Sequence, residues 1–351
     1  MRHHFLLLPL ALIANDGSRQ AGIDSRIRFP SGITLDQAGN VIVADRSANL
    51  VFRIDARTNA ITVLAGTGAP GWSGDGGPAT QAQLAAPEWV EYDADGNLYL
   101  ADRGNHRIRK IDRQGIITHI AGTGELATSA EGGRAAASAL TNPFGLTLDR
   151  LGNVFVFDTE AHRIRRIDAR TGVITTVIGN GQRGFGGDGG PATAAMLYRP
   201  HSGVFDRDGT LIFGDSFNQR IRRWDPGTGI ITTIAGTGQE GQVADGTPAM
   251  DASFRFFGSM IIDRNGDLVF TSLDHRILKL DRRANTIRVI AGTGTAGSGG
   301  DNGPARSAQF NAPYGLAMAP NGDLIVADAG NSRVRRIDAA TGTIRTIAGA
   351  R

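Results

Sequence analysis

Three side chains in this sequence carry the groups that acid–base or metal chemistry requires: Glu88, Glu91 and His201. A carboxylate and an imidazole within reach of one substrate can act as acid, base or metal ligand. If one site brings these residues together, the chain is a hydrolase or a lyase. Whether it does so depends on the elements that position them.

Histidine could also supply a zinc site, because His106, His162 and His275 occupy equivalent places and lie on one face with His201. Against zinc, each of the three precedes an arginine in a recurring His-Arg pair, which favours a structural role in a turn. The chain has no cysteine, which excludes thiolate metal sites, disulfides and a cysteine nucleophile. No Gly-x-Ser-x-Gly motif indicates a serine nucleophile. We therefore predict no metal and no cofactor.

An internal repeat determines where these residues lie. Segments beginning at Pro30, Pro87, Pro143, Pro200, Phe257 and Pro313 follow one another at spacings of 57, 56, 57, 57 and 56 residues. Each unit contains four β-like runs separated by tight turns such as Asp95-Gly96-Asn97. This period and strand count predict an all-β fold, a six-bladed β-propeller with four antiparallel strands per blade, over residues 29–351. Turns copied around the ring explain the 49 glycines, about twice ordinary usage.

The repeated motif resembles the NHL repeat. It is clearest in Ala101-Asp-Arg-Gly-Asn-His-Arg-Ile-Arg-Lys-Ile-Asp112 and in Ala327-Asp-Ala-Gly-Asn-Ser-Arg-Val-Arg-Arg-Ile-Asp338. The connections Ala65-Gly-Thr-Gly68 and Ser73-Gly-Asp-Gly-Gly-Pro-Ala79 are similar to those of bacterial NHL proteins and of the NHL propeller of teneurins. The resemblance implies the propeller fold. It leaves function open, because the family includes adhesion modules, sensor domains, RNA binders and a few enzymes.

Charged residues that recur in the units are expected to be structural. We predict that the aspartate ending the second strand pairs with the arginine opening the third; these are Asp45, Asp102, Asp158, Asp215 and Asp328, and Arg107, Arg163, Arg220, Arg276 and Arg333. An acid also follows each Gly-rich connection, and we predict that it accepts backbone N–H bonds in a turn rather than binding calcium or phosphate; these are Asp75, Glu131, Asp188, Asp245 and Asp301.

Positions where the units disagree are the candidates for ligand contact. The residue after the first proline of each unit is Ser31, Glu88, Phe144, His201, Gly258 or Tyr314, and the next is Gly32, Trp89, Gly145, Ser202, Ser259 or Gly315. Strand order places this row at the entrance of the central channel. An acid, an imidazole and aromatics are typical of a ligand site, although drift around a water-filled channel would also explain them. We predict that the ligand-binding residues are Glu88, Trp89, Phe144, His201 and Tyr314, with Trp72 and Phe185 on nearby loops as added aromatic surface or as loop anchors.

These observations favour a non-enzymatic interaction module, expected to be monomeric, that binds a protein or glycan partner over its loop-rich face. A hydrolase or lyase that uses Glu88, Glu91 and His201 at the channel mouth is the alternative. RNA binding is a second alternative. It is disfavoured because the net charge is only +3 and most of the repeated arginines lie near a repeated aspartate.

The N-terminus resembles a secretory signal over residues 1–14, with Met1-Arg-His-His before the apolar run Phe5-Leu-Leu-Leu-Pro-Leu-Ala-Leu-Ile-Ala14. The run is too short to span a bilayer as a helix, so we expect export to the periplasm or the exterior. Residues 15–28 resemble an inter-blade loop, and we expect this lead-in segment to pack against the sixth blade and close the ring.

Overall fold

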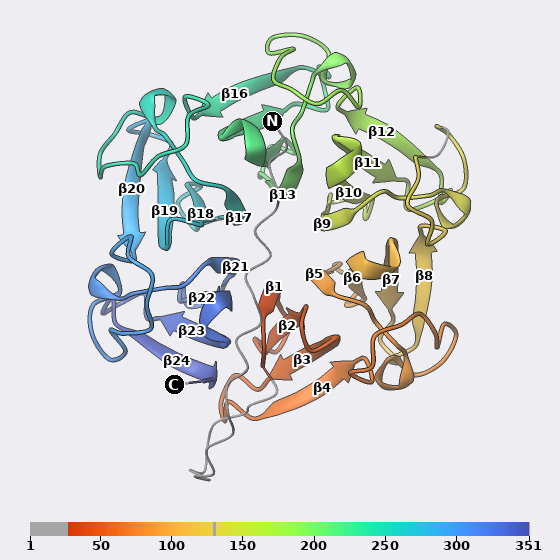
Figure 1. Cartoon of the computed structure of the whole chain (residues 1–351), viewed down its shortest axis with the longest axis horizontal. Coiled ribbons are helices and arrows are strands. Elements are labelled where there is room, and N and C mark those ends of the chain that lie inside the picture. The colour runs from red at the N-terminus through yellow and green to blue at the C-terminus, as the bar shows by residue number, and fades with distance from the viewer. Residues whose placement is uncertain (1–26, 129–130, 351) are drawn as a thin grey trace, which may run out of the picture.

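Six antiparallel sheets of four strands each stand around a central axis (Figure 1), which confirms the predicted six-bladed β-propeller. The computed structural model describes residues 27–128 and 131–350. Within these ranges the chain forms strands, turns and short 3₁₀ helices, and it contains no α-helix. Each repeat supplies one complete blade.

The strands follow the chain from the axis outward in every blade. Blades one and two contain β1 (Pro30–Leu35), β2 (Val41–Asp45), β3 (Leu50–Ile54), β4 (Ile61–Ala65), β5 (Pro87–Tyr92), β6 (Leu98–Asp102), β7 (Arg107–Ile111) and β8 (Ile117–Ala121). Blades three and four contain β9 (Pro143–Leu148), β10 (Val154–Asp158), β11 (Arg163–Ile167), β12 (Ile174–Ile178), β13 (Pro200–Phe205), β14 (Leu211–Asp215), β15 (Arg220–Trp224) and β16 (Ile231–Ala235). Blades five and six contain β17 (Phe257–Ile262), β18 (Leu268–Ser272), β19 (Arg276–Asp281), β20 (Thr286–Ala291), β21 (Pro313–Met318), β22 (Leu324–Asp328), β23 (Arg333–Ile337) and β24 (Ile344–Gly349).

Short 3₁₀ helices occupy two kinds of loop. Those between second and third strands are η2 (Arg103–Asn105), η4 (Thr159–Ala161), η6 (Ser216–Asn218) and η9 (Ala329–Asn331). Those in the connections between blades are η1 (Ala79–Gln81), η3 (Ala135–Ala137), η5 (Ala192–Ala194), η7 (Ala249–Asp251) and η8 (Ala305–Ser307).

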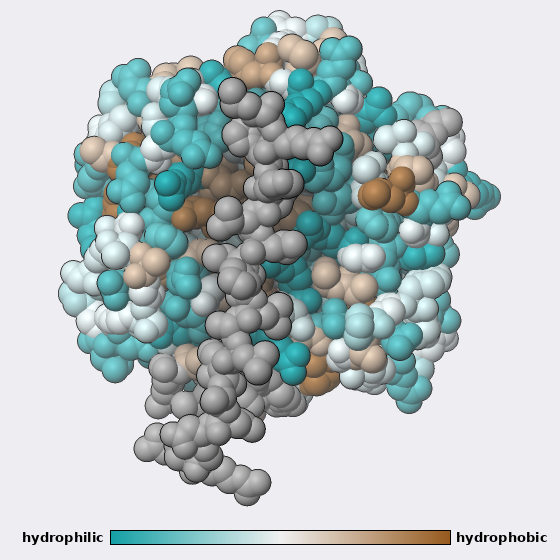
Figure 2. All heavy atoms as spheres, viewed as in Figure 1, coloured by the Kyte–Doolittle hydropathy of each residue, from teal (hydrophilic) through white to brown (hydrophobic). Residues whose placement is uncertain are grey.

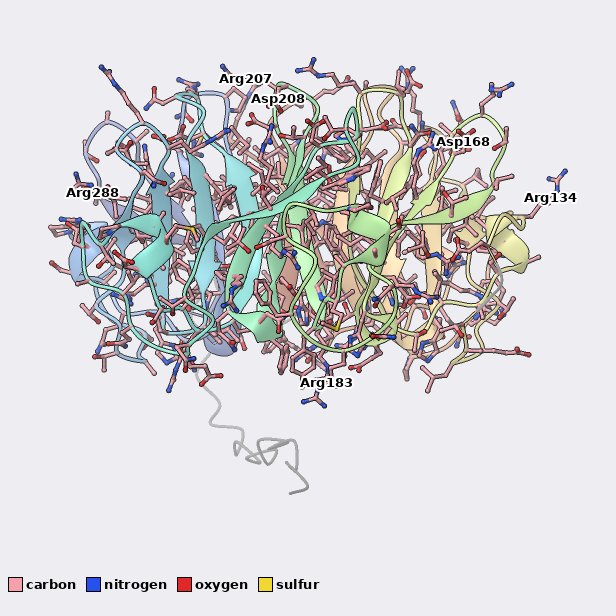
Figure 3. All side chains as sticks on the ribbon, turned by 90° about the horizontal axis from the view of Figure 1, so that it is seen from above. Arg134, Asp168, Arg183, Arg207, Asp208 and Arg288 are labelled. Carbon is pink, nitrogen blue, oxygen red and sulfur yellow. The ribbon has the colours of Figure 1, made fainter. Side chains whose placement is uncertain are left out.

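The ring has two different faces. The loop face carries the connections between blades and the loops between second and third strands, and Arg183 projects from it. The hairpin face carries the tight turns between first and second strands, and Arg207 and Asp208 lie there (Figure 3). Because every inner strand starts at the loop face, the residues after the first proline of each unit gather at that end of the axis.

The apolar core lies between the blades. Within the described ranges, six clusters of buried residues each join two neighbouring blades, as where Ala101 and Ile108 of blade two pack with Leu140, Leu146 and Val154 at blade three. A seventh, small cluster lies at the axis. Strands in the middle of a blade are covered on both sides, so they read as continuous apolar runs rather than alternating ones.

Blades six and one close the ring through the same kind of contact. Ile27 is 3% exposed and packs with Ala317, Ile325 and Val334 of blade six. The hydroxyl of Ser332 donates to the carbonyl oxygen of Arg28 at 2.6 Å. Residues 27 and 28 thus contact blade six. Residues 15–26 lie outside the described residues, so the predicted closure by the segment 15–28 stays a prediction.

We expect Ile27→Ala to lower the free energy of unfolding by about 2–3 kcal/mol, because the change leaves a cavity between the first and last blades. Ile230→Ala is the matched control, since Ile230 is 40% exposed and should change stability by no more than about 0.5 kcal/mol. Chemical denaturation of both variants measures the difference. Equal losses would show that Ile27 does not join the two blades.

The aspartate at the end of the second strand binds the chain that enters its own blade. Asp102 accepts the backbone N–H of Ala85 at 2.8 Å, and Asp158 accepts those of Thr141 and Asn142 at 2.9 and 2.8 Å. In blade five, where the aspartate is missing, the hydroxyl of Ser272 donates to the carbonyl of Arg255 at 3.2 Å. This aspartate therefore fixes where each inner strand begins.

The predicted pairing of this aspartate with the arginine that opens the third strand is wrong in most blades. Arg333 does donate to Asp328, at 2.8 Å, but Asp102 is approached by Arg109, at 3.6 Å, rather than by Arg107. Arg107 instead donates to the carbonyls of Asn105 and Thr123 at 2.9 and 2.6 Å. Residues two apart on a strand share a face, so spacing alone did not distinguish the two arginines.

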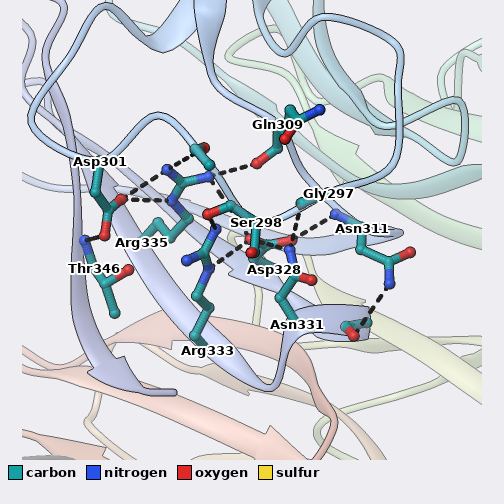
Figure 4. Close-up of polar contacts among 12 residues, drawn as sticks. Gly297, Ser298, Asp301, Gln309, Asn311, Asp328, Asn331, Arg333, Arg335 and Thr346 are labelled. Atoms are coloured by element: carbon teal, nitrogen blue, oxygen red, sulfur yellow. Dashed lines mark hydrogen bonds and ion pairs between the residues drawn. The ribbon is translucent and has the colours of Figure 1, made fainter. Parts of the chain in front are cut away.

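The acid after each Gly-rich connection accepts backbone N–H bonds in three blades, as predicted, but from the fourth strand of the following blade rather than within its own turn; these bonds join Glu131 to Thr176, Asp245 to Val289 and Asp301 to Thr346. Its other partners are arginines. Asp75 accepts from buried Arg109 at 2.6 Å, and Asp188 accepts from buried Arg222 at the same distance. In blade six, Arg335 donates to Asp301 at 2.7 and 3.1 Å (Figure 4). In four blades the acid thus clamps a connection onto the third strand of the following blade, whereas Asp245 pairs with Arg306 and the fourth strand. Its role is structural in both cases.

Candidate functional site

Four of the predicted site residues meet at the loop-face end of the axis. Glu88, Phe144, His201 and Tyr314 are each the second residue of an inner strand, in β5, β9, β13 and β21. Their exposures are 0, 4, 4 and 6%. We call these residues, with Phe217 and Phe256 beside them, the axial cluster. Figure 2 views this face, where hydrophilic atoms cover most of the visible surface and apolar atoms appear in small patches.

Glu88 is the only acid of the axial cluster, and two arginines approach it. Its Oε2 lies 3.1 Å from Arg103 and 3.8 Å from Arg46. The Arg103 guanidinium also covers the ring of Phe144, 4.9 Å from its centroid. The second oxygen, Oε1, is buried and has no hydrogen-bond partner among the described residues. Since an ionised carboxylate can accept several hydrogen bonds, Glu88 retains an acceptor for an incoming donor.

His201 is enclosed by aromatic rings. Its ring centroid lies 4.3 Å from that of Phe144 and 4.2 Å from that of Phe256, both edge-to-face, and 6.0 Å from that of Phe217. Burial, followed by the charge of Arg103, holds the pKa of His201 well below its ordinary value. The imidazole is therefore neutral at pH 7. Among the described residues, no group bonds its Nδ1.

Tyr314 completes the cluster from blade six and packs against Phe144 of blade three. Its ring centroid lies 5.9 Å from that of Phe144. Burial, and secondarily the charge of Glu88, raises the pKa of Tyr314 well above its ordinary value. The site therefore holds one carboxylate, a neutral imidazole and a neutral phenol among aromatic rings.

Trp72 and Phe185 add aromatic surface at the edge of the loop face. They are 41% and 38% exposed. The guanidinium of Arg107 lies 3.8 Å from the ring centroid of Trp72, and that of Arg220 lies 3.8 Å from the ring centroid of Phe185. Each ring therefore rests on an arginine and also presents aromatic surface; a ligand contact of these residues stays a prediction.

Trp89 lies apart from the axial cluster. It is 5% exposed and packs in the core between blades two and three, with Tyr99 and Leu146. Successive residues of a strand face opposite sides, so a row next to the site row points between blades. The predicted ligand contact of Trp89 is therefore corrected to a packing role.

Glu91 also lies apart from Glu88 and His201. It belongs to a pocket on the hairpin face and accepts a hydrogen bond from Thr147 Oγ1 at 3.1 Å. Burial raises the pKa of Glu91 to about 7. The structure therefore does not bring the three predicted acid–base residues into one site.

We expect Glu91→Gln to make stability less dependent on pH. The folded-state pKa lies above the ordinary value of 4.5, so the folded chain binds more protons between these values and loses stability as pH rises through them. At pH 5 the variant should match the wild type, and at pH 8 it should be more stable by about 2 kcal/mol. Urea denaturation at both pH values checks this. A difference independent of pH would contradict it.

The repeated histidines form hydrogen bonds between neighbouring blades. His106 Nδ1 lies 2.9 Å from the carbonyl oxygen of Thr141, and the Nδ1 atoms of His162 and His275 lie 3.3 and 3.1 Å from the backbone nitrogens of Arg199 and Ala312. Each contact reaches the segment that enters the next blade, as expected for a structural role. Among residues 27–128 and 131–350, no group of three or more His, Cys, Asp or Glu side chains is arranged to hold a metal ion.

Several residues of the site were missed in the sequence. Phe29, Arg199 and Phe256 stand just before the start of an inner strand, where other blades have alanine or asparagine. This row varies as much as the predicted one, so the same comparison of repeats would have found it. Arg46, Arg103 and Phe217 lie in the loops after second strands, which the comparison of inner-strand positions did not cover.

Comparison with known sequence families identifies the repeats. The pattern of the teneurin NHL domain matches residues 55–131, and that of the NHL repeat matches residues 310–337. The chain is thus a six-bladed β-propeller whose repeats match the NHL repeat and the teneurin NHL domain over these segments.

Two relatives show how the similarity is distributed. NHL repeat-containing protein 2 from Bos taurus is 28% identical over 309 residues, covering 78% of this chain and 42% of the relative. Teneurin-1 from Homo sapiens is 27% identical over 359 residues, covering 90% of this chain and 12% of the relative. The chain thus spans less than half the length of these curated relatives.

Solved structures share the fold at low identity. A structural genomics protein of unknown function from Bacteroides thetaiotaomicron superimposes with a TM-score of 0.66 at 17% identity, over 92% of this chain and 71% of that one. Virginiamycin B lyase from Staphylococcus aureus gives 0.52 at 17%, over 91% and 83%. A gluconolactonase from Xanthomonas campestris gives 0.55 at 13%, over 86% and 84%.

Proposed function

We propose that the chain is a non-enzymatic binding module that recognises a protein partner across its loop face. The observation that carries this proposal is the axial cluster, in which Glu88 Oε1 and His201 Nδ1 are buried without partners among the described residues. Leaving such atoms unbonded costs free energy, which a partner's polar groups would recover.

The composition of the loop face supports a protein partner. Protein interfaces are enriched in aromatic side chains and arginine, and their binding energy concentrates in a few such residues. Here Arg46 and Arg103 flank the axial cluster, while Trp72 and Phe185 are exposed farther out, over the third strands of blades two and four. Each exposed ring already rests on a guanidinium, so little side-chain entropy is lost when a partner covers it.

The test is affinity capture of proteins from the source organism with three baits. Wild-type chain and Leu151→Ala, which removes an exposed leucine of the hairpin face, should capture the same protein. The double variant Trp72→Ala/Phe185→Ala should bind that protein at least about ten-fold more weakly and so capture less of it. This corresponds to a loss of about 1.4 kcal/mol in binding free energy. Equal capture by all three baits would contradict the proposal, as would binding confined to a glycan array.

A hydrolase or lyase at the axial cluster is the second candidate. The neutral imidazole of His201, with a free ring nitrogen, has the form that a general base requires. Two of the solved structures with this fold are a lyase and a gluconolactonase. Metal analysis of purified chain separates the candidates. A stoichiometric ion that is lost in His201→Ala or Glu88→Gln would support the enzyme and contradict the pure binding module.

Export stays a prediction, because residues 1–14 lie outside the described residues. In the described part of the chain, none of the helices has the length and apolar character needed to cross a membrane. N-terminal sequencing of the protein recovered from the periplasm or the medium tests whether the segment is removed.

A further inference from the structure

A second candidate site lies on the hairpin face. A pocket of about 820 Å³ opens between blades two, three and four, and its rim is formed by the turns after β5, β9 and β13. Arg207 marks this face, opposite to Arg183 (Figure 3). The volume is within the range of small-molecule sites.

Aromatic side chains form much of the pocket wall. Its lining includes Tyr92, Tyr99, Phe155 and Phe205. The rings of Phe155 and Phe205 pack edge-to-face at 4.7 Å, which fixes their orientation. Aromatic faces attract both apolar groups and organic cations.

Carboxylates outnumber cationic groups around this pocket. Five acids line it, Glu91, Asp93, Asp95, Asp149 and Asp206, against Lys110, Arg150 and Arg207. Both arginines are engaged at the rim, where Arg150 donates to the carbonyl of Arg207 at 2.6 Å and Arg207 to that of Arg264 at 3.2 Å. Lys110 lies over the ring of Tyr99 at 5.5 Å. The pocket therefore favours a positively charged ligand.

Most of these acids already have structural roles. Asp93 and Asp149 accept hydrogen bonds from Asn97 and Asn153 in their own turns, and Asp206 pairs with Arg282. Glu91 also accepts hydrogen bonds, from Thr147, the backbone of Leu148 and the Trp89 side chain, but the described residues form no ion pair with it. Its inner-strand position holds Thr34, Thr147, Val204, Ile261 and Ala317 in the other blades, so no repeated structural role requires an acid there. A half-buried carboxylate without a cation is costly, and a bound cation would offset that cost.

We propose that this pocket binds a small organic cation with an apolar or aromatic arm, with Glu91 as its counter-charge and the aromatic wall as its contact surface. This site is independent of the proposed loop-face partner, because it lies on the opposite face. Of the groups around Glu91, Thr147 and Tyr99 are neutral at pH 7. The charged groups around it are the other four acids and the three cations of the lining.

Binding of such a cation depends on pH through Glu91. Because the pKa of Glu91 is about 7 in the free chain, this carboxyl is mostly protonated at pH 6 and mostly ionised at pH 8. A permanent cation binds the ionised form, so its affinity should rise about ten-fold between these pH values.

The probe is benzyltrimethylammonium, titrated calorimetrically into the full chain at pH 6 and pH 8, with benzyl alcohol and benzoate as neutral and anionic comparisons. We expect the cation alone to bind, about ten-fold more tightly at pH 8. Glu91→Gln and Glu91→Thr should weaken binding at pH 8 at least ten-fold and remove the pH dependence. Glu91→Thr introduces the residue of blades one and three, and Glu125→Gln on the loop face is the control.

Three results would overturn the proposal: no binding of the cation at pH 8, equal binding of benzyl alcohol, or unchanged affinity in a folded Glu91 variant. Thermal unfolding establishes that each variant is folded. If neither variant folds, the pH dependence of the wild-type chain decides, since an affinity equal at pH 6 and pH 8 contradicts the role of Glu91.

Discussion

Replacement of Arg335 by alanine should lower the free energy of unfolding by about 3–5 kcal/mol, the range found when one partner of a buried ion pair is removed. The Arg335 side chain is fully buried, with an exposure of 0%. It donates twice to Asp301, at 2.7 and 3.1 Å, and lies 3.7 Å from the buried carboxylate of Asp328 (Figure 4).

The loss is large because the variant also leaves backbone carbonyls without donors. Arg335 donates to the carbonyl oxygens of Gln309 and Gly299 at 2.7 and 3.3 Å. Both belong to the connection that enters blade six. Arg335→Lys should have an intermediate effect, because lysine keeps the charge but lacks the planar fork that serves several acceptors.

Arg345→Ala is the matched control, since Arg345 is exposed on β24 of the same blade, and it should change stability by no more than about 0.5 kcal/mol. Chemical denaturation followed by circular dichroism measures all three variants. If Arg335→Ala is as stable as Arg345→Ala, the clamp between connection and third strand does not stabilise the ring.

Replacement of Gly122 by alanine should cost about 3–5 kcal/mol, the range of the most disruptive single substitutions. Gly122 has φ +93°, and a Cβ there would lie 2.1 Å from the carbonyl oxygen of His106. The strain of this φ value and the overlap with a fixed backbone atom add together. The same geometry recurs in the other blades, at Gly66, Gly179, Gly236, Gly292 and Gly349.

Gly115→Ala separates backbone strain from overlap. Gly115 has φ +80°, but no atom lies within 4 Å of the position of its Cβ, so only the strain remains, about 1 kcal/mol. Thermal and chemical denaturation of the two variants should therefore differ clearly. Equal losses would show that close approach at the exit of the fourth strand is not what requires glycine.

The fold was predictable because the sequence repeats with a long, regular period and because recognisable turn residues separate its strands. The repeat from Pro30 to Pro313 sets the number of blades, and tight turns set four strands in each. The ion-pair partners of the repeated charged side chains were less predictable. Arg107 and Arg109 lie on the same face of β7, and only three-dimensional reach decides that Arg109 meets Asp75 and Asp102.

Only part of the site was predictable from the sequence. The residues that directly follow the site residues in each blade show why. The row after the site row is mostly glycine and serine because inner strands touch there. A Cβ on Gly145 would lie 2.2 Å from the carbonyl of His201, and one on Gly315 2.1 Å from that of Ser31. Variation at Trp89 therefore reflects packing between blades, whereas variation at Glu88 and His201 places unlike groups at the axis.

The central claim is that residues which repeat build the ring, while residues which differ at the loop face bind a partner. The most direct test measures partner affinity and unfolding free energy on the same samples of wild-type chain, Trp72→Ala/Phe185→Ala and Leu151→Ala. We predict that the loop-face variant weakens affinity at least about ten-fold and lowers stability by no more than about 2 kcal/mol, with Leu151→Ala unchanged in both. Unchanged affinity in the folded loop-face variant would contradict the claim.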